Sequence, residues 1–164
     1  MQMESLQELL VHDLRDLYSA ENQLLKAMPK MAKKATNPDL KKAFETHMRE
    51  TEGQVQRLQK IFEKLGKKPT GKKCAAMEGL IEEGKEAMGE DMDEETMDAA
   101  LIAVAQKIEH YEIAGYGTTR TWAQQIGDDQ TARLLQQTLD EEGKTDKLLT
   151  ELAESTINVE AAQA

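Results

Sequence analysis

Apolar residues recur every three or four positions along most of the chain, which is the spacing of one face of an α-helix. The composition agrees with this, because β-branched and aromatic residues are scarce and only three prolines occur. The helical pattern predicts four long helices and one short one, over about residues 3–35, 38–65, 74–88, 93–126 and 128–155. The protein is therefore expected to be all-α.

Several residues mark where these helices begin and end. Asn37 can cap the second helix, and Pro38 suits its first helical position. Gly66 and Gly127 are natural stops for the second and third long helices. Pro29 is expected to bend the first helix or to end its regular part.

The order of the helices predicts the architecture. The first two long helices are joined by a tight turn, and so are the last two, whereas residues 66–92 separate the two pairs and contain the short helix. A long crossover between two helical hairpins is typical of ferritin-like bundles. We expect a ferritin-like four-helix bundle with a short extra helix in its crossover, as a single domain over 1–156, followed by a frayed tail over 157–164.

Carboxylates interrupt the apolar stripes near the middle of each long helix. Glu21 and Glu142 stand where the leucine pattern requires an apolar residue, while Glu109 and Glu112 continue the apolar face of the third helix. Glu50 occupies the middle of the second helix. A bare carboxylate on a buried face is costly unless it is paired, hydrogen-bonded or bound to a metal.

The spacing of these residues predicts that they share one layer. Glu21 and Glu50 are 29 positions apart, and Glu112 and Glu142 are 30 apart, with a tight turn midway between the members of each pair. Residues symmetric about the turn of an antiparallel hairpin come level. Like charges in a dry layer would force protonation, and two divalent cations would compensate them.

Other polar residues near this layer leave alternatives open. Gln54 and Asp146 are further candidate ligands, and His47, one turn before Glu50, is either a ligand or a hydrogen-bonding partner. Tyr18 and Tyr111 either bond to carboxylates or simply pack. The remaining histidines and the single cysteine are expected to be structural or exposed, namely His12, His110 and Cys74.

Composition narrows the classes of partner. The net charge of −10 argues against nucleic acid and against an anionic membrane as binding partners, since both are bound by clustered Lys and Arg. No apolar run approaches the ~20 residues of a membrane span, and the N-terminus does not read as a signal segment. A single cysteine suits a reducing compartment, so a cytoplasmic protein is expected.

Five stretches of this sequence resemble the YciE/YciF family of ferritin-like proteins. The likeness extends from about Met3 to Ala153. It implies a bacterial, cytoplasmic, stress-linked bundle that has a dinuclear metal site and forms homodimers. The stretches are Tyr18-Ser-Ala-Glu21, His47-Met-Arg-Glu50-Thr-Glu-Gly-Gln54, Cys74-Ala-Ala-Met-Glu-Gly-Leu-Ile81, Glu109-His-Tyr-Glu112-Ile-Ala-Gly-Tyr116 and Leu139-Asp-Glu-Glu142.

A broader resemblance, to rubrerythrin-type di-iron bundles, has two departures. Gly53 and Asp146 stand where those bundles have histidines, so the resemblance implies an oxygen-rich site suited to Fe or Mn. The chain also lacks paired cysteines for electron transfer, so a redox cycle would need an external electron donor.

Three functions remain compatible with these patterns. The leading hypothesis is a di-metal carboxylate protein with redox chemistry on O2 or peroxide, in which Glu50 and Glu142 bridge the metals. The second is a metal-binding or storage protein without turnover. The third is a structural stress protein whose glutamates form a polar core layer.

Overall fold

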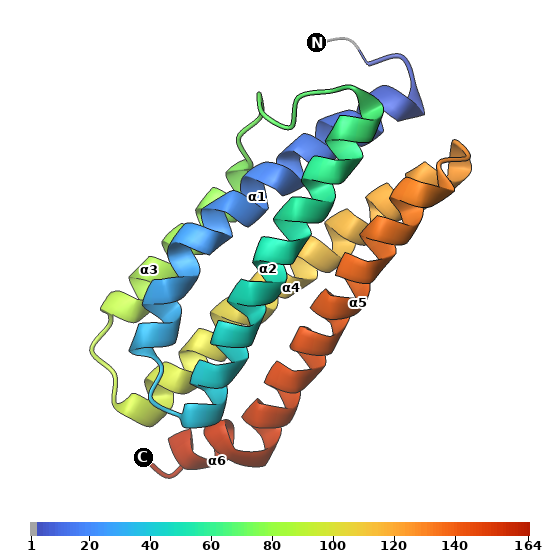
Figure 1. The fold of residues 1–164 in the computed structure, drawn as a ribbon. Coiled ribbons are helices and arrows are strands. Elements are labelled where there is room, and N and C mark those ends of the chain that lie inside the picture. The colour runs from blue at the N-terminus through green and yellow to red at the C-terminus, as the bar shows by residue number, and fades with distance from the viewer. Residues whose placement is uncertain (1–2) are drawn as a thin grey trace.

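Four long helices run side by side and a shorter helix lies beside the first of them, as Figure 1 shows for the computed structural model, which describes residues 3–164. Residues 3–164 contain no strand, so the expected all-α bundle is confirmed. The start of the first helix and the C-terminus lie at opposite ends of the bundle. The elements are α1 (Leu6–Lys34), α2 (Pro38–Leu65), α3 (Ala75–Gly89), α4 (Glu94–Gln125), α5 (Asp129–Leu152), a π-helical turn η1 (Ala153–Ile157) and α6 (Asn158–Ala161).

Helix ends follow the expected capping chemistry. The Asn37 side chain accepts hydrogen bonds from the first backbone N–H groups of α2, and Gly66 ends that helix with a φ of 63°, which favours glycine. Pro29 does not end α1, which continues to Lys34. Met31 and Ala35, beyond the proline, are buried, and this packing holds the last turns in place.

The turn between α1 and α2 is fixed by a carboxylate from α4. The two Asp98 oxygens accept hydrogen bonds of 2.8 Å from the backbone N–H groups of Thr36 and Asn37 and from the Thr36 hydroxyl. These bonds satisfy donors at the start of α2 that have no partner within the helix. Asp98 therefore ties the first hairpin to the second.

The crossover helix α3 packs against α1 and α4 and adds a third element to that side of the bundle. At Gly84 a Cβ atom would lie 3.0 Å from Val104 Cγ1, so the missing side chain allows α3 to approach α4 closely. Gly115 on α4 acts in the same way against Leu17 of α1. α4 is a regular helix there, so Gly115 marks a close helix contact and not a distortion.

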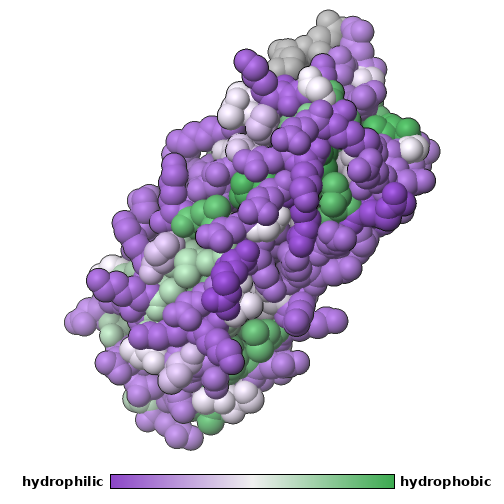
Figure 2. Space-filling view, in the orientation of Figure 1, coloured by the Kyte–Doolittle hydropathy of each residue, from purple (hydrophilic) through white to green (hydrophobic). Residues whose placement is uncertain are grey.

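A polar layer separates the core into two apolar clusters. One cluster surrounds Leu24, Met28 and Ile108, and the other surrounds Leu14 and Leu135. The stripes of α1, α4 and α5 pass from one cluster to the other through the carboxylates that were predicted to interrupt them. The stripe of α2 passes instead through His47, Thr51 and Gln54. The face of the bundle that Figure 2 shows is mainly hydrophilic, with scattered hydrophobic residues. Within residues 3–164, the helices are too short or too polar to cross a lipid bilayer.

The C-terminal segment differs from the expected frayed tail. After α5 the chain continues through the π-helical turn η1 into α6, so residues up to Ala161 are helical. Ile157 is buried in the core cluster around Leu24, and α6 contacts α4. Burial of this one apolar side chain orders a segment whose composition alone did not predict it.

Candidate metal centre

Five ionisable side chains from all four long helices meet in the polar layer. Each is at most 5% exposed, although a carboxylate or imidazole of this kind usually lies at the surface. The helical stripes explain the burial, since each residue occupies a core position of its own helix. They are Glu21 of α1, His47 of α2, Glu109 and Glu112 of α4 and Glu142 of α5.

These side chains form two groups of three that share one member. The first group is His47, Glu109 and Glu142, and the second is Glu21, Glu112 and Glu142. Within each group, one donor atom from every residue lies within 4.8 Å of the others. Glu142 therefore lies between two adjacent sets of ligand atoms, the position that a bridging carboxylate occupies in a dinuclear site.

The donor atoms of these groups largely lack hydrogen-bond partners in the described part of the chain. Both carboxylate oxygens of Glu112 and of Glu142, one oxygen each of Glu21 and Glu109, and both ring nitrogens of His47 are buried without one. Buried polar atoms are normally bonded, so a cluster of orphaned ligand atoms requires an explanation. Divalent cations fit, because they take carboxylate oxygen and imidazole nitrogen together.

Burial and mutual repulsion perturb the carboxyl groups of the layer. Burial raises the pKa of Glu21 to about 7, even though the Tyr116 hydroxyl opposes this by donating a 2.6 Å hydrogen bond to its Oε1. Burial, together with the neighbouring carboxylates, raises the pKa of Glu112 and of Glu142 well above the usual range. Without a cation, the layer holds protons at pH values where exposed glutamates are ionised.

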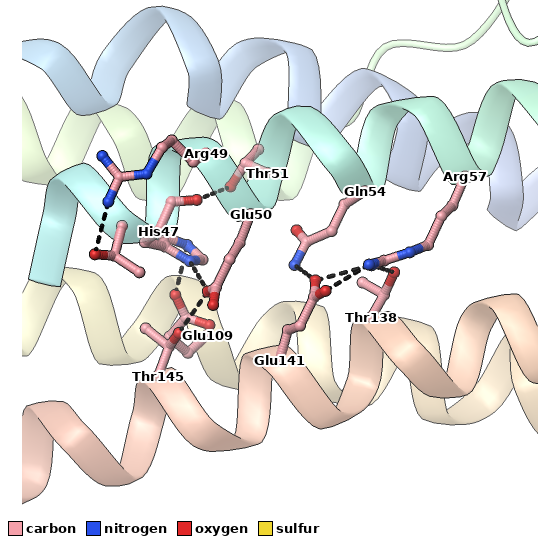
Figure 3. A network of polar contacts seen from close by, with 11 residues as sticks. His47, Arg49, Glu50, Thr51, Gln54, Arg57, Glu109, Thr138, Glu141 and Thr145 are labelled. Carbon is pink, nitrogen blue, oxygen red and sulfur yellow. Dashed lines mark hydrogen bonds and ion pairs between the residues drawn. The ribbon is translucent and has the colours of Figure 1, made fainter.

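His47 supplies positive charge to the layer. Burial alone would lower its pKa, but the neighbouring Glu109 carboxylate outweighs this and raises the pKa well above the ordinary value. His47 Nε2 lies 2.8 Å from Glu109 Oε1 as an ion pair, although its geometry falls outside that of a hydrogen bond. Figure 3 shows His47 of α2 pointing toward Glu109, with Glu50 beside it.

Glu50 lies at the edge of the layer and not within it. Its side chain is 24% exposed, with Oε2 3.9 Å from His47 Nδ1 and accepting a 3.3 Å hydrogen bond from Thr145. The contact with His47 lowers the pKa of Glu50. Glu50 belongs to neither donor group. Glu142 is thus shared by both donor groups whereas Glu50 is in neither, and the expectation that the two residues bridge metals stays a prediction.

Gln54 and Asp146 lie in other networks. Gln54 is buried and its Nε2 donates a 3.0 Å hydrogen bond to Glu141, which Arg57 also binds, as Figure 3 shows; its Oε1 has no hydrogen-bond partner within residues 3–164. Asp146 is partly exposed and its Oδ1 lies 3.1 Å from His110 Nε2. Asp146 belongs to neither donor group, and its Oδ1 is paired with a histidine at the surface.

Tyr116 is a site residue that the sequence patterns did not single out. It is fully buried, and its hydroxyl binds Glu21 from the α4 side. Tyr116 follows Glu112 by four positions and Glu109 by seven, so it lies on the same face of α4 as these two carboxylates. This helical spacing could have identified Tyr116 from the sequence. The tyrosines that were considered lie elsewhere. Tyr111 contacts Asp16 and Cys74, and Tyr18 packs edge-on against Phe62.

The crossover topology and the buried layer of carboxylates define the class: the protein is a ferritin-like helical bundle. It belongs to the family described as "Domain of unknown function (DUF892)", whose model matches residues 5–162.

Two bacterial proteins are similar to nearly the whole of this chain. Protein YciF of Escherichia coli K12 is 46% identical over 162 residues, which cover 98% of each chain. The crystal structure of the E. coli stress protein YciF matches with a TM-score of 0.91 over 95% of this chain and 99% of that one. A structure from Rhodopseudomonas palustris, described as "YcfI, a putative structural protein", is 46% identical and matches with a TM-score of 0.88, covering 91% of this chain and 95% of that one.

Proposed function

We propose that this protein binds two divalent cations, iron or manganese, in the polar layer of the bundle. The observation that carries the proposal is the group of orphaned, buried oxygen and nitrogen atoms that Glu142 shares between two donor sets. Buried polar atoms normally have a partner, and two cations would provide one for the donor atoms of both sets at once. Two cations would neutralise four buried carboxylates at once.

Each side chain then has a defined part. Glu142 would contribute to both cation positions, His47 and Glu109 to one, and Glu21 and Glu112 to the other. Tyr116 orients Glu21 through its hydroxyl hydrogen bond. Glu50, at the solvent edge of the layer, is a further candidate ligand. Gln54 is a further candidate as well, because its Oε1 is buried without a hydrogen-bond partner within residues 3–164. Asp146 is a weaker one, because its Oδ1 is already paired with His110.

A redox function on O2 or peroxide in stress protection extends this proposal. Bound iron or manganese would supply the electrons for such a reaction. The support for a stress role is the likeness to the E. coli protein, which is described as a stress protein. The chain has a single cysteine, buried at Cys74, so repeated turnover would need an external electron donor.

The second candidate function is metal binding or structural support without turnover. The R. palustris relative, described as a putative structural protein, favours it. The two functions make different demands on the polar layer: a structural layer needs only protons or water to satisfy its carboxylates.

Metal analysis and oxidant consumption separate these functions. The protein, purified without chelator and then loaded with Fe(II) or Mn(II), is expected to carry about two ions per chain and to consume O2 or peroxide when a reductant is supplied. Ions without consumption would support a binding protein. A chain that takes up no ion under either condition would overturn the proposal.

We also propose that the protein acts as a homodimer in the cytoplasm. Half-buried apolar side chains on the outer faces, such as Leu9, Leu25 and Trp122, would gain from a partner surface. Sedimentation should then give twice the chain mass of 18.4 kDa at micromolar concentration, and a single species of the chain mass would contradict the dimer.

A further inference from the structure

Two neighbouring cavities lie between the surface and the polar layer. The outer one is a groove of about 360 Å³ beside α1, with apolar side chains such as Ile81 and Val104 in its lining and charged side chains such as Lys30 and Lys85 among them. The inner one is a cavity of about 10 Å³, lined entirely by buried residues. Met31 and Ile108 line both, so these two side chains form the partition between them.

The inner cavity ends at the candidate metal centre. His47 and Glu109, the ion pair of the first donor group, form its polar end. The rest of its wall is apolar, formed by Leu24, Met28, Met31, Phe44, Ala105 and Ile108. Its volume is about that of one water-sized sphere, but a buried water needs two to four polar partners and this wall offers them at one end only.

The partition is suited to transient opening. Met31 is unbranched and has three rotatable side-chain bonds, so it can move aside without displacing the helix backbone. Met28, on the inner side, is also a methionine. A small molecule could therefore pass from the groove to the inner cavity while α1 and α4 remain packed.

The lining of the inner cavity determines which kind of molecule can enter it. A hydrated cation would lose its water in an apolar passage without gaining ligands, which is costly. The side of the layer near Glu50, which is partly exposed, is better suited to cations. A neutral, apolar molecule such as molecular oxygen has no such cost. Because it is larger than one water, it enters the inner cavity of about 10 Å³ only when the flexible Met28 and Met31 side chains move aside.

We propose that the groove, the Met31–Ile108 partition and the apolar inner cavity form an entry path for molecular oxygen, which reaches the His47–Glu109 side of the polar layer. The use of this path in a reaction rests on the proposed function. The occupancy of the cavity by oxygen does not, because the cavity exists without any cation.

Nuclear magnetic resonance of the metal-free full chain tests the path directly. With the methionine methyl groups labelled, paramagnetic relaxation under oxygen pressure, compared with the same pressure of nitrogen, reports where oxygen resides. Met28 and Met31 are expected to relax several-fold more than Met77 and Met97, which are equally buried but line neither cavity. Equal relaxation at all four methionines would overturn the path.

A matched pair of variants on α4 adds a second measurement. Ala105→Val places extra methyl groups at the inner cavity and should reduce the relaxation of Met28 to the level of Met77. Ala103→Val makes the same change at an exposed position and should leave the relaxation unchanged. Unchanged relaxation in a folded Ala105→Val would contradict the path; if that variant does not fold, the wild-type comparison decides. Because no metal is present, a negative result here leaves the proposed metal function standing, and failure to bind metal leaves this result standing.

Discussion

His47 of α2 and Glu109 of α4 are joined across the diagonal of the bundle, with Nε2 2.8 Å from Oε1. Their helices are not primary packing neighbours, since α2 packs mainly on α1 and α5, and α4 on α1, α3 and α5. A buried pair that spans a diagonal compensates charge at the centre of the bundle. In the proposed metal-loaded protein both partners would turn from each other to a cation.

His47 should therefore control one of the two cation positions. His47→Gln removes the imidazole nitrogen from the first donor group and leaves Glu21 and Glu112 of the second group intact. Titration with Mn(II) is expected to show one position weakened by at least about tenfold, equivalent to about 1.4 kcal/mol, while the other persists. His110→Gln, at an exposed histidine, is the control. Equal affinity at both positions in His47→Gln would show that His47 is not a ligand.

Tyr116→Phe tests the support of Glu21. The change keeps the ring and removes the hydroxyl that donates to Glu21 Oε1. A buried oxygen left without its partner costs about 1–3 kcal/mol. The melting temperature of the metal-free protein should therefore be lower in Tyr116→Phe by roughly 2–10 °C. Tyr18→Phe is the matched control, because the Tyr18 hydroxyl makes only a long hydrogen bond from Gln59 near the surface. A similar small change in both variants would argue against a special role for Tyr116.

The metal-free protein should lose stability as the pH rises toward neutrality. The folded-state pKa of Glu21 is about 7, against an ordinary value of 4.5, and the pKa values of Glu112 and Glu142 are raised in the same direction. The folded state thus binds more protons than the unfolded state in this interval, and the free energy of unfolding falls with pH. The stabilising contribution is complete below about pH 4.5 and declines through pH 7.

Melting temperatures of metal-free protein between pH 5 and 8 measure this trend. Carboxylates with lowered pKa values, such as Glu50 and Asp16, contribute in the opposite direction, but below the interval, because their loss of stability occurs as the pH falls under their usual range. Loading with metal should flatten the decline, since cations replace protons as the compensating charge. A metal-free protein that becomes more stable from pH 5 to pH 7 would contradict this account.

Most of the fold could be predicted from sequence because its signals are local. The helical spacing, the Asn37–Pro38 start and the Gly66 stop act within a few residues of themselves, and the structure places α2 at the expected bounds. The Asp98 bonds to the α1–α2 turn join residues about 60 positions apart and have no local pattern. The helical structure of the last residues likewise depends on a contact that is distant in the sequence, namely the packing of Ile157 in the core cluster around Leu24.

The sequence predicted which residues lie at the level of the candidate site along the bundle, but not which side chains point into it. Glu21, Glu109, Glu112 and Glu142 interrupt apolar stripes, and the structure brings them together. In α2, His47 and Glu50 are one turn apart, and the rotation of the helix decides that His47 points inward. Asp146 is four residues from Glu142, yet it turns to His110 at the surface. The spacing of residues along one helix does not show how the helix is rotated about its axis, and therefore does not show which of these side chains face the interior of the bundle.

Metal content per chain in a Glu142→Gln variant tests the central claim most directly. The amide keeps the size and helix propensity of the side chain but removes the charge shared by both donor groups. After loading with Fe(II) or Mn(II), wild-type protein should retain about two ions and Glu142→Gln should lose both, while Glu151→Gln, an exposed change on the same helix, should match wild type. The metal-free variant should melt at or above the wild-type temperature, because one of several mutually repelling buried carboxylates is gone. Full metal content in Glu142→Gln, with a lowered melting temperature of its metal-free form, would contradict the dinuclear site.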